Sequence, residues 1–247
     1  MTAILETNGV NVSIGAANIL QSIELRVNKA ETVGIIGPNG SGKTTLFNTL
    51  SGFLPCTAGK INFLGQDVTS VPAHQRAKLG IGRVFQNFGI FRDMSLLENM
   101  ICALEGRTNS LSSFFPWSKA NRKNKTTAID YLSQINLEGK ANEKAANLSG
   151  GQMRLLEIIR TLAAGAELFL LDEPTAGVSP KMKDDVIGII NKLQAMNKTV
   201  LIIEHDINFI QKFCKRIIVL DGGKIVLDDT PEKVRSNKQL QEIYFGS

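Results

Sequence analysis

The chain has 247 residues, of which 43% are hydrophobic and 21% charged, so it can bury a large core and lies near the upper size limit for one domain. Its three cysteines, Cys56, Cys102 and Cys214, are odd in number and widely separated, which argues for reduced thiols and against a disulfide framework or a zinc site. No apolar run approaches the ~18 residues of a membrane span, and the N-terminus lacks signal-peptide features, so we expect a cytosolic protein. The formal charge of +5 fits phosphate ligands and an anionic membrane surface, or equally a solvated basic face.

The N-terminal part of the chain is rich in strand patterns. Residues 4–13, 19–27 and 59–63 each predict a strand. Residues 32–36 form a short apolar run suited to a buried strand, and residues 43–50 can begin a helix. A glycine-rich segment joins these last two, which gives the order strand, turn, helix.

This glycine-rich segment and the start of the helix match the phosphate-binding P-loop pattern, Gly, any four residues, Gly-Lys-Ser/Thr. Glycines let backbone N–H groups close around phosphate oxygens, and the helix start adds unpaired N–H donors. Lys43 is predicted to reach the β and γ phosphates, and the Thr44 hydroxyl to bind Mg²⁺. The predicted nucleotide-binding residues here are Gly37, Pro38, Asn39, Gly40, Ser41, Gly42, Lys43, Thr44 and Thr45. The alternative is a glycine-rich turn that only looks like a P-loop.

A mostly helical pattern runs from residue 95 to about residue 165 and contains the motif Leu148-Ser149-Gly150-Gly151-Gln152. Ser149 is a plausible helix N-cap, which leaves two glycines in the first turn. The helix would turn its apolar residues inward, namely Leu155, Leu156, Ile159 and Leu162. Such a helix start is a second potential anion site.

Strand patterns at residues 168–171, 200–203 and 217–220 alternate with helices, as in a parallel α/β sheet. The first of these strands ends in Asp172 and Glu173. Asp172 is predicted to hold Mg²⁺ through water, and Glu173 to take a proton from an attacking water, a role worth typically ~10²- to 10⁴-fold in rate. The alternative, an N-cap by Asp172 with a solvated Glu173, explains one acid but not both.

The motif at residues 148–152 resembles the signature of ATP-binding-cassette (ABC) ATPases. The resemblance implies an α/β fold of the P-loop NTPase class, with a RecA-like core, an N-terminal antiparallel β subdomain and an inserted α-helical subdomain. We expect one ABC ATPase domain over residues 1–247. Residues 1–92 and 165–247 would form the nucleotide-binding core, and residues 93–164 the helical subdomain with the signature motif.

The same resemblance implies a shared ATP site. In this family the signature covers the γ-phosphate held by the P-loop of a second ATPase, so the chain is expected to be half of a dimer with two ATP sites. The signature residues predicted to contact nucleotide are Ser149, Gly150, Gly151 and Gln152.

Three further residues take roles from the resemblance. Gln86 resembles the Q-loop glutamine that touches Mg²⁺ and the attacking water, and His205 resembles the switch histidine that hydrogen-bonds the γ-phosphate. Ile14 lies near the position where many members stack an aromatic ring on adenine, and it offers apolar contact without a π face. The expected catalytic residues are thus Glu173, His205 and Gln86, and the expected Mg²⁺ ligands Thr44, Gln86 and Asp172.

Over nearly its whole length the chain is similar to one ABC branch, the LivG-type ATPases of importers for branched-chain and other neutral amino acids, with the urea importers close by. The similarity lies in residues 82–87 and 90–99, the long insert before Tyr131, residues 176–180 and the tail at 231–246.

This branch implies an ATPase that energises amino acid import from the cytoplasmic face of the cell membrane as a peripheral subunit. The implied partners are two permease subunits, a second ABC ATPase in a heterodimer or homodimer, and an extracytoplasmic solute-binding protein, with no nucleic acid.

Two segments depart from what is usual. Where other ABC proteins carry Ser-Ala-Leu-Asp, this chain has Gly177-Val178-Ser179-Pro180, so the cross-dimer contact of that loop stays open. The aromatic and basic segment 114–125 is either a loop folded back on the helical insert or a contact with the membrane subunit or lipid. Other functions compatible with some or all motifs are a urea importer, a lipopolysaccharide-type exporter, a soluble ABC ATPase and a P-loop kinase.

Overall fold

A computed structural model describes residues 2–86, 89–106 and 119–237. Within these ranges no helix combines the length and the apolar character needed to cross a membrane. Residues 114–118 of the aromatic and basic segment, and the tail beyond residue 237, lie outside the described residues. Arg122, Lys123 and Lys125 of that segment are exposed.

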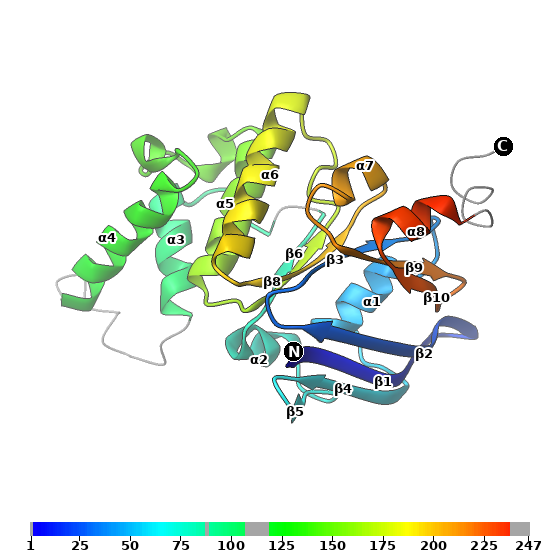
Figure 1. The fold of residues 1–247 in the computed structure, drawn as a ribbon. Helices are drawn as coiled ribbons and strands as arrows, with labels where there is room; N and C mark the ends of the chain where they lie inside the picture. Colours follow the sequence, from blue (N-terminus) through cyan, green and yellow to red (C-terminus); the bar gives the residue numbers. More distant parts are fainter. Residues whose placement is uncertain (1, 87–88, 107–118, 238–247) are drawn as a thin grey trace.

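An antiparallel sheet of four strands, in the order β2, β1, β4, β5, forms one layer (Figure 1). Its strands are β1 (Ala3–Ile14), β2 (Ala17–Asn28), β4 (Ala58–Phe63) and β5 (Gln66–Asp67). Leu5 pairs with Val27 on one side and Phe63 on the other, and all three are buried. The three N-terminal strands predicted from the sequence are confirmed, whereas the two-residue β5 gives no sequence signal.

A second sheet has six strands in the order β10, β9, β3, β8, β7, β6, parallel except for the β9 and β10 pair. Its strands are β3 (Thr32–Ile36), β6 (Ile81–Val84), β7 (Leu168–Asp172), β8 (Thr199–Ile203), β9 (Arg216–Asp221) and β10 (Lys224–Asp229). Every residue of β3, β7 and β8 is buried, because both faces of a parallel sheet are covered. β10, which alternates exposed and half-buried residues at the edge, was not predicted.

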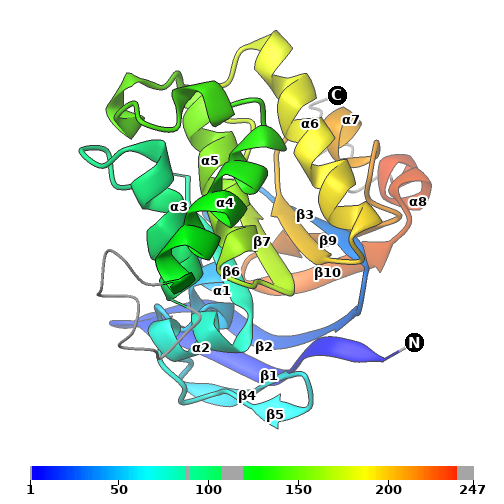
Figure 2. The same cartoon turned by 90° about the vertical axis from the view of Figure 1, so that its left-hand side faces the viewer.

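Helix α1 (Lys43–Leu50) lies between the two sheets (Figures 1 and 2). Its residues Leu46, Phe47 and Leu50 are fully buried in one apolar cluster with residues of both sheets. The helix at residues 43–50 is as predicted. Because α1 is held from both sides, the P-loop at its start has a rigid support.

The opposite face of the six-stranded sheet is covered by α5 (Gly150–Ala163), α6 (Pro180–Ala195) and α7 (Ile207–Ile210). Helices α3 (Leu96–Glu105) and α4 (Lys119–Ser133) pack against α5 and against each other (Figure 2). The remaining elements are α2 (Ala73–Leu79), η2 (Glu138–Lys140), η3 (Ala145–Asn147) and α8 (Pro231–Ser236).

The order and direction of the strands bring the predicted site residues to one edge of the six-stranded sheet. Strands β3, β8, β7 and β6 are neighbours and parallel, so their C-terminal ends meet at one edge of the sheet. The P-loop follows β3, Glu173 follows β7, and His205 and Gln86 follow β8 and β6 closely. Ligands of open α/β sheets bind at this edge.

Candidate nucleotide site

The P-loop has a backbone that requires glycine at two positions. A Cβ on Gly37 would lie 2.1 Å from the Leu220 carbonyl oxygen, so no side chain fits there. Gly42 has φ 104° and is the N-cap of α1, without a capping side chain. Because no side chain caps α1, its first N–H groups are available to an anionic ligand.

Lys43 is held by its own loop. Its Nζ donates to the carbonyl oxygens of Gly37 at 2.6 Å and Pro38 at 2.9 Å, which leaves one of its three donors. Burial lowers the pKa of the Lys43 ammonium, while the nearby Glu173 and Asp172 carboxylates act to raise it. The charge of the cation therefore interacts with the charges of both predicted acids.

The other P-loop side chains divide by exposure. Asn39 and Thr44 are exposed and Thr45 is half-buried. The Ser41 hydroxyl is buried and has no hydrogen-bond partner, which leaves a polar atom in the loop that a bound oxygen could satisfy.

Asp172 ends β7 as a buried residue and is not a helix N-cap. Its Oδ2 accepts a hydrogen bond from Nη2 of Arg83 at 2.7 Å, in an ion pair whose two side chains are each 4% exposed. The N-cap alternative considered for Asp172 is therefore wrong.

Glu173 is the meeting point of the predicted catalytic residues. Its backbone is left-handed, with φ 46°, a conformation that costs a non-glycine residue about 1–3 kcal/mol and clusters at functional sites. Its Oε2 accepts from Nε2 of Gln86 at 3.0 Å, and its Oε1 lies 2.8 Å from Nε2 of His205. The structure thus brings together three residues that are far apart in the sequence.

The signature motif begins α5 as predicted. Ser149 and Gln152 form a capping box, in which each side chain bonds the other residue's backbone N–H. The four apolar residues predicted to face inward are buried. Gly151 is buried against α6, where an added Cβ would lie 2.5 Å from Cε of Met182.

The start of the signature turn and Ile14, which the sequence predicts to contact nucleotide, are exposed in this chain. Ser149 and Gly150 are exposed, and the hydrogen bonds described for the Ser149 and Gln152 side chains join these two residues to each other. Ile14 ends β1 with 54% of its surface exposed. The loop after β7 ends at Ser179, which is the N-cap of α6 with Pro180 at the first helical position.

A buried ion pair on α5 holds the segment that carries Gln86, and sequence reasoning missed it. Nη1 of Arg154 pairs with Glu157 at 2.8 Å and also donates to the Phe85 carbonyl, and Nη2 donates to the Gln86 carbonyl at 2.9 Å. In return Glu157 accepts from the backbone N–H of Phe85 at 3.1 Å and of Gly89 at 3.0 Å. The available signal was the spacing of an arginine and a glutamate at i and i+3 on a largely apolar helix.

A second missed residue links the catalytic loops. Glu204, directly before His205, is buried and accepts from Thr175 N at 3.0 Å and Thr175 Oγ1 at 2.6 Å. Burial raises the pKa of the Glu204 carboxyl, against the effect of these hydrogen bonds. The hydrogen bonds of Glu204 to Thr175 tie the loop after Glu173 to the loop that carries His205.

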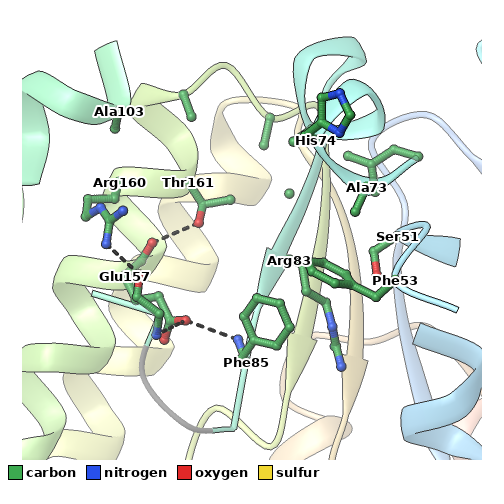
Figure 3. A pocket seen from close by; sticks show the side chains of 16 residues that line it. Ser51, Phe53, Ala73, His74, Arg83, Phe85, Ala103, Glu157, Arg160 and Thr161 are labelled. Carbon is green, nitrogen blue, oxygen red and sulfur yellow. Dashed lines mark hydrogen bonds between the residues drawn. The ribbon is translucent and has the colours of Figure 1, made fainter. Parts of the chain in front are cut away.

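A cavity of about 520 Å³ opens beside the Gln86 segment (Figure 3). Phe53, His74, Arg83, Phe85 and Arg160 are among its lining residues. Phe53 is 58% exposed and stacks edge-on against Phe85 at 5.2 Å between ring centroids. The cavity therefore offers an apolar surface beside Phe85, the residue before Gln86.

The side chains present suit a magnesium ion. The Asp172 carboxylate, the Thr44 hydroxyl and the Gln86 amide are oxygen donors, the type that Mg²⁺ prefers, and Mg²⁺ takes further ligands from water and phosphate. The Gln86 side chain donates to Glu173 through its amide nitrogen. The amide oxygen of Gln86 takes no part in that hydrogen bond. These features define the class of protein, a P-loop nucleotide-binding ATPase.

Comparison with known proteins identifies the family. The ABC transporter family matches residues 20–176. The chain is 37% identical to the high-affinity branched-chain amino acid transport ATP-binding protein BraF of Pseudomonas aeruginosa, over 98% of both chains. It is 34% identical to the lipopolysaccharide export system ATP-binding protein LptB of Haemophilus influenzae, over 99% of this chain and 98% of LptB.

A solved structure has a similar fold. A dimeric ATP-binding cassette, bound to ADP and phosphate in a post-hydrolysis state, superimposes with a TM-score of 0.80 and 27% identity, over 92% of this chain and 98% of that one. The chain belongs to the ABC transporter family and is an ATP-binding, ATP-hydrolysing cassette.

Proposed function

We propose that the chain is the ATPase subunit that energises an importer for branched-chain or other neutral amino acids. The observation that carries the ATPase assignment is the joining of Gln86, Glu173 and His205 by hydrogen bonds beside Lys43. The support for amino acid import is the similarity to BraF across the whole chain.

In the proposed mechanism the P-loop holds the phosphates. The N–H groups at the start of α1 and the remaining donor of Lys43 bind phosphate oxygens. Thr44, Asp172 and Gln86 would hold Mg²⁺, which neutralises charge on the β and γ phosphates.

Glu173 is the proposed general base. It accepts a proton from the attacking water, and Gln86 keeps its Oε2 atom in place. His205 Nε2, which bonds Glu173 Oε1 in the chain without nucleotide, would turn to the γ-phosphate when ATP binds and stabilise the charge that develops there.

The second half of the site is proposed to come from a second ABC ATPase, in a heterodimer or a homodimer. The exposed Ser149 and Gly150 at the start of α5 are suited to bind the γ-phosphate on another cassette. The dimeric relative bound to ADP and phosphate supports this arrangement. Ile14 is proposed to contact adenine through its exposed apolar side chain.

The proposed membrane partners are two permease subunits, fed by an extracytoplasmic solute-binding protein, with the chain peripheral at the cytoplasmic face. We place the permease contact at the cavity beside Gln86, between the core of residues 1–92 and 165–247 and the helical part of residues 93–164. The exposed Phe53 in its lining supports an apolar partner segment.

A second candidate is an exporter ATPase, because LptB is nearly as similar as BraF. Tagging the chain, purifying it from native membranes and identifying the copurified proteins separates the two. Uptake of labelled leucine, other neutral amino acids and urea by a deletion strain then tests the substrate. Loss of leucine or neutral amino acid uptake supports the proposal, whereas unchanged uptake contradicts it.

A further inference from the structure

Arg83 is a buried arginine that the proposed mechanism does not use. It lies on β6, and its guanidinium reaches the neighbouring strand β7 to pair with Asp172 at 2.7 Å. The same Nη2 lies 3.4 Å from Oδ1 of Asn48 on α1. The side chain therefore bridges the Gln86 strand, the predicted metal carboxylate and the helix of the P-loop.

The surroundings of Arg83 are costly for a cation. Its Nε and Nη1 are buried without a hydrogen-bond partner. Its Cζ lies 4.8 Å from the centroid of the Phe47 ring and 5.3 Å from that of Phe85, beside which it lies in Figure 3. Attraction to two ring faces offsets part of the desolvation cost, but an arginine that only filled space could be replaced by an apolar side chain.

The negative charge of Asp172 is the reason for a cation at the position of Arg83. A buried carboxylate needs a partner of opposite charge, and Arg83 makes the only ion pair to Asp172 among the described residues. Mg²⁺ must bind at this same carboxylate if Asp172 has the role proposed above. A fixed positive charge within 3 Å of the carboxylate opposes a second cation there.

We propose that Arg83 is the resident counter-ion of Asp172 and suppresses binding of a bare divalent cation, so that the metal enters together with the nucleotide phosphates. The phosphates supply the negative charge that outweighs Arg83, whereas Asp172 and Glu173 alone are balanced by Arg83 and Lys43. Arg83 is thus a positioning residue that makes metal binding depend on nucleotide. This inference rests on the proposed metal role of Asp172.

The test measures Mn²⁺ binding to the chain without nucleotide, by loss of the electron paramagnetic resonance signal of the free ion. Wild type should bind Mn²⁺ weakly, and Arg83→Met should bind it about tenfold or more tightly because one positive charge is gone. Arg83→Gln, which keeps a donor but no charge, should also gain affinity, while Arg83→Lys should resemble wild type. The double variant Arg83→Met/Asp172→Asn should lose the gain.

A matched control is Arg76→Met. Arg76 is equally buried but donates to the carbonyl oxygens of Thr49, Leu50, Thr69 and Val71, so its removal should destabilise the fold without changing Mn²⁺ affinity. A wild-type Mn²⁺ affinity equal to that of the neutral variants, or a gain that survives Asp172→Asn, would overturn the inference.

A separate arm tests the premise. In wild type Mn²⁺ should tighten ATP binding, and Asp172→Asn should remove most of that effect. If Asp172→Asn leaves it unchanged, the proposed metal role of Asp172 fails. If only the neutral Arg83 variants fail to gain affinity, the metal role stands and the inference about Arg83 falls.

Discussion

Glu173 follows the buried strand β7 in left-handed backbone, and both of its carboxylate oxygens are hydrogen-bonded to predicted catalytic residues. This backbone conformation raises the energy of the folded chain and directs the Glu173 side chain to the edge of the sheet.

Replacing Glu173 by glutamine should leave nucleotide binding intact and lower ATP hydrolysis by about 10²-fold or more, because an amide cannot take the proton from water. Hydrolysis and binding are measured in the assembled transporter. As the control, Lys43→Ala should lose ATP binding itself. Near-normal hydrolysis by Glu173→Gln would refute the general-base assignment.

Glu204 allows a test by pH. Burial raises the pKa of its carboxyl above the usual 4.5, so the folded state holds the proton more tightly than the unfolded state. The wild type therefore loses stability at this site as pH rises from 4.5 through the raised pKa. Glu204→Gln keeps an acceptor for Thr175 and lacks this loss, so its Tm relative to wild type should increase from pH 5 to pH 8. A difference in Tm that is constant or falls with pH would contradict the account.

Motif residues such as Gly37 and Lys43 could be predicted from the sequence, because the chemistry of phosphate binding determines both the residue type and the spacing. The same holds for the carboxylates after the buried strand. The roles of Arg83 and Glu204 were not predictable. Their partners, Asp172 and Thr175, are distant in sequence, and only the sheet order brings them together.

Helix α5 is the element that connects the two halves of the proposed site. Its first turn carries the exposed Ser149 and Gly150. One to two turns later, Arg154 and Glu157 bond backbone groups of Phe85, Gln86 and Gly89. A displacement of α5 would therefore move Gln86 as well. The strand and helix patterns revealed this element and its N-cap, but not what Arg154 and Glu157 bind.

The Arg154 and Glu157 pair should show strong coupling in stability. Removing one partner of a buried ion pair typically costs about 3–5 kcal/mol, since it leaves an uncompensated charge. The double variant Arg154→Met/Glu157→Leu should lose less stability than the sum of the two single variants, measured by urea unfolding. It should still fall below wild type because the Phe85 and Gly89 N–H groups lose their acceptor. Simple additivity would show that the two side chains act independently.

At the scale of the whole molecule, the two sheets enclose α1 and leave the P-loop, Glu173 and His205 along one open edge. The alternation of apolar strands and helices after residue 165 predicted the parallel sheet. The added edge strand β10 was missed because its alternating pattern, Lys224 to Asp229, is half exposed and charged at the end. The side chains of Ser149 and Gln152 hydrogen-bond each other's backbone at the start of α5, which is consistent with the proposal that a second cassette completes the site.

The central claim is that nucleotide is bound between two cassettes. It predicts that a variant unable to hydrolyse ATP stays in the closed, ATP-bound pair. ATP with Glu173→Gln should stabilise a closed pair of ATPase subunits in the purified transporter, because closure precedes hydrolysis. Ser149→Arg should prevent the pair from closing while leaving ATP binding to the P-loop intact, since the added side chain fills the phosphate position. Light scattering of the ATPase subunits or cross-linking across the pair measures the closed form.

The most direct measurement is the structure of the assembled complex carrying Glu173→Gln with ATP bound. We predict ATP on the Lys43 loop with its γ-phosphate covered by the signature helix of a second cassette, and Ser149 of this chain on the partner's nucleotide. A closed, ATP-bound complex in which the Ser149 turn faces solvent would contradict the account.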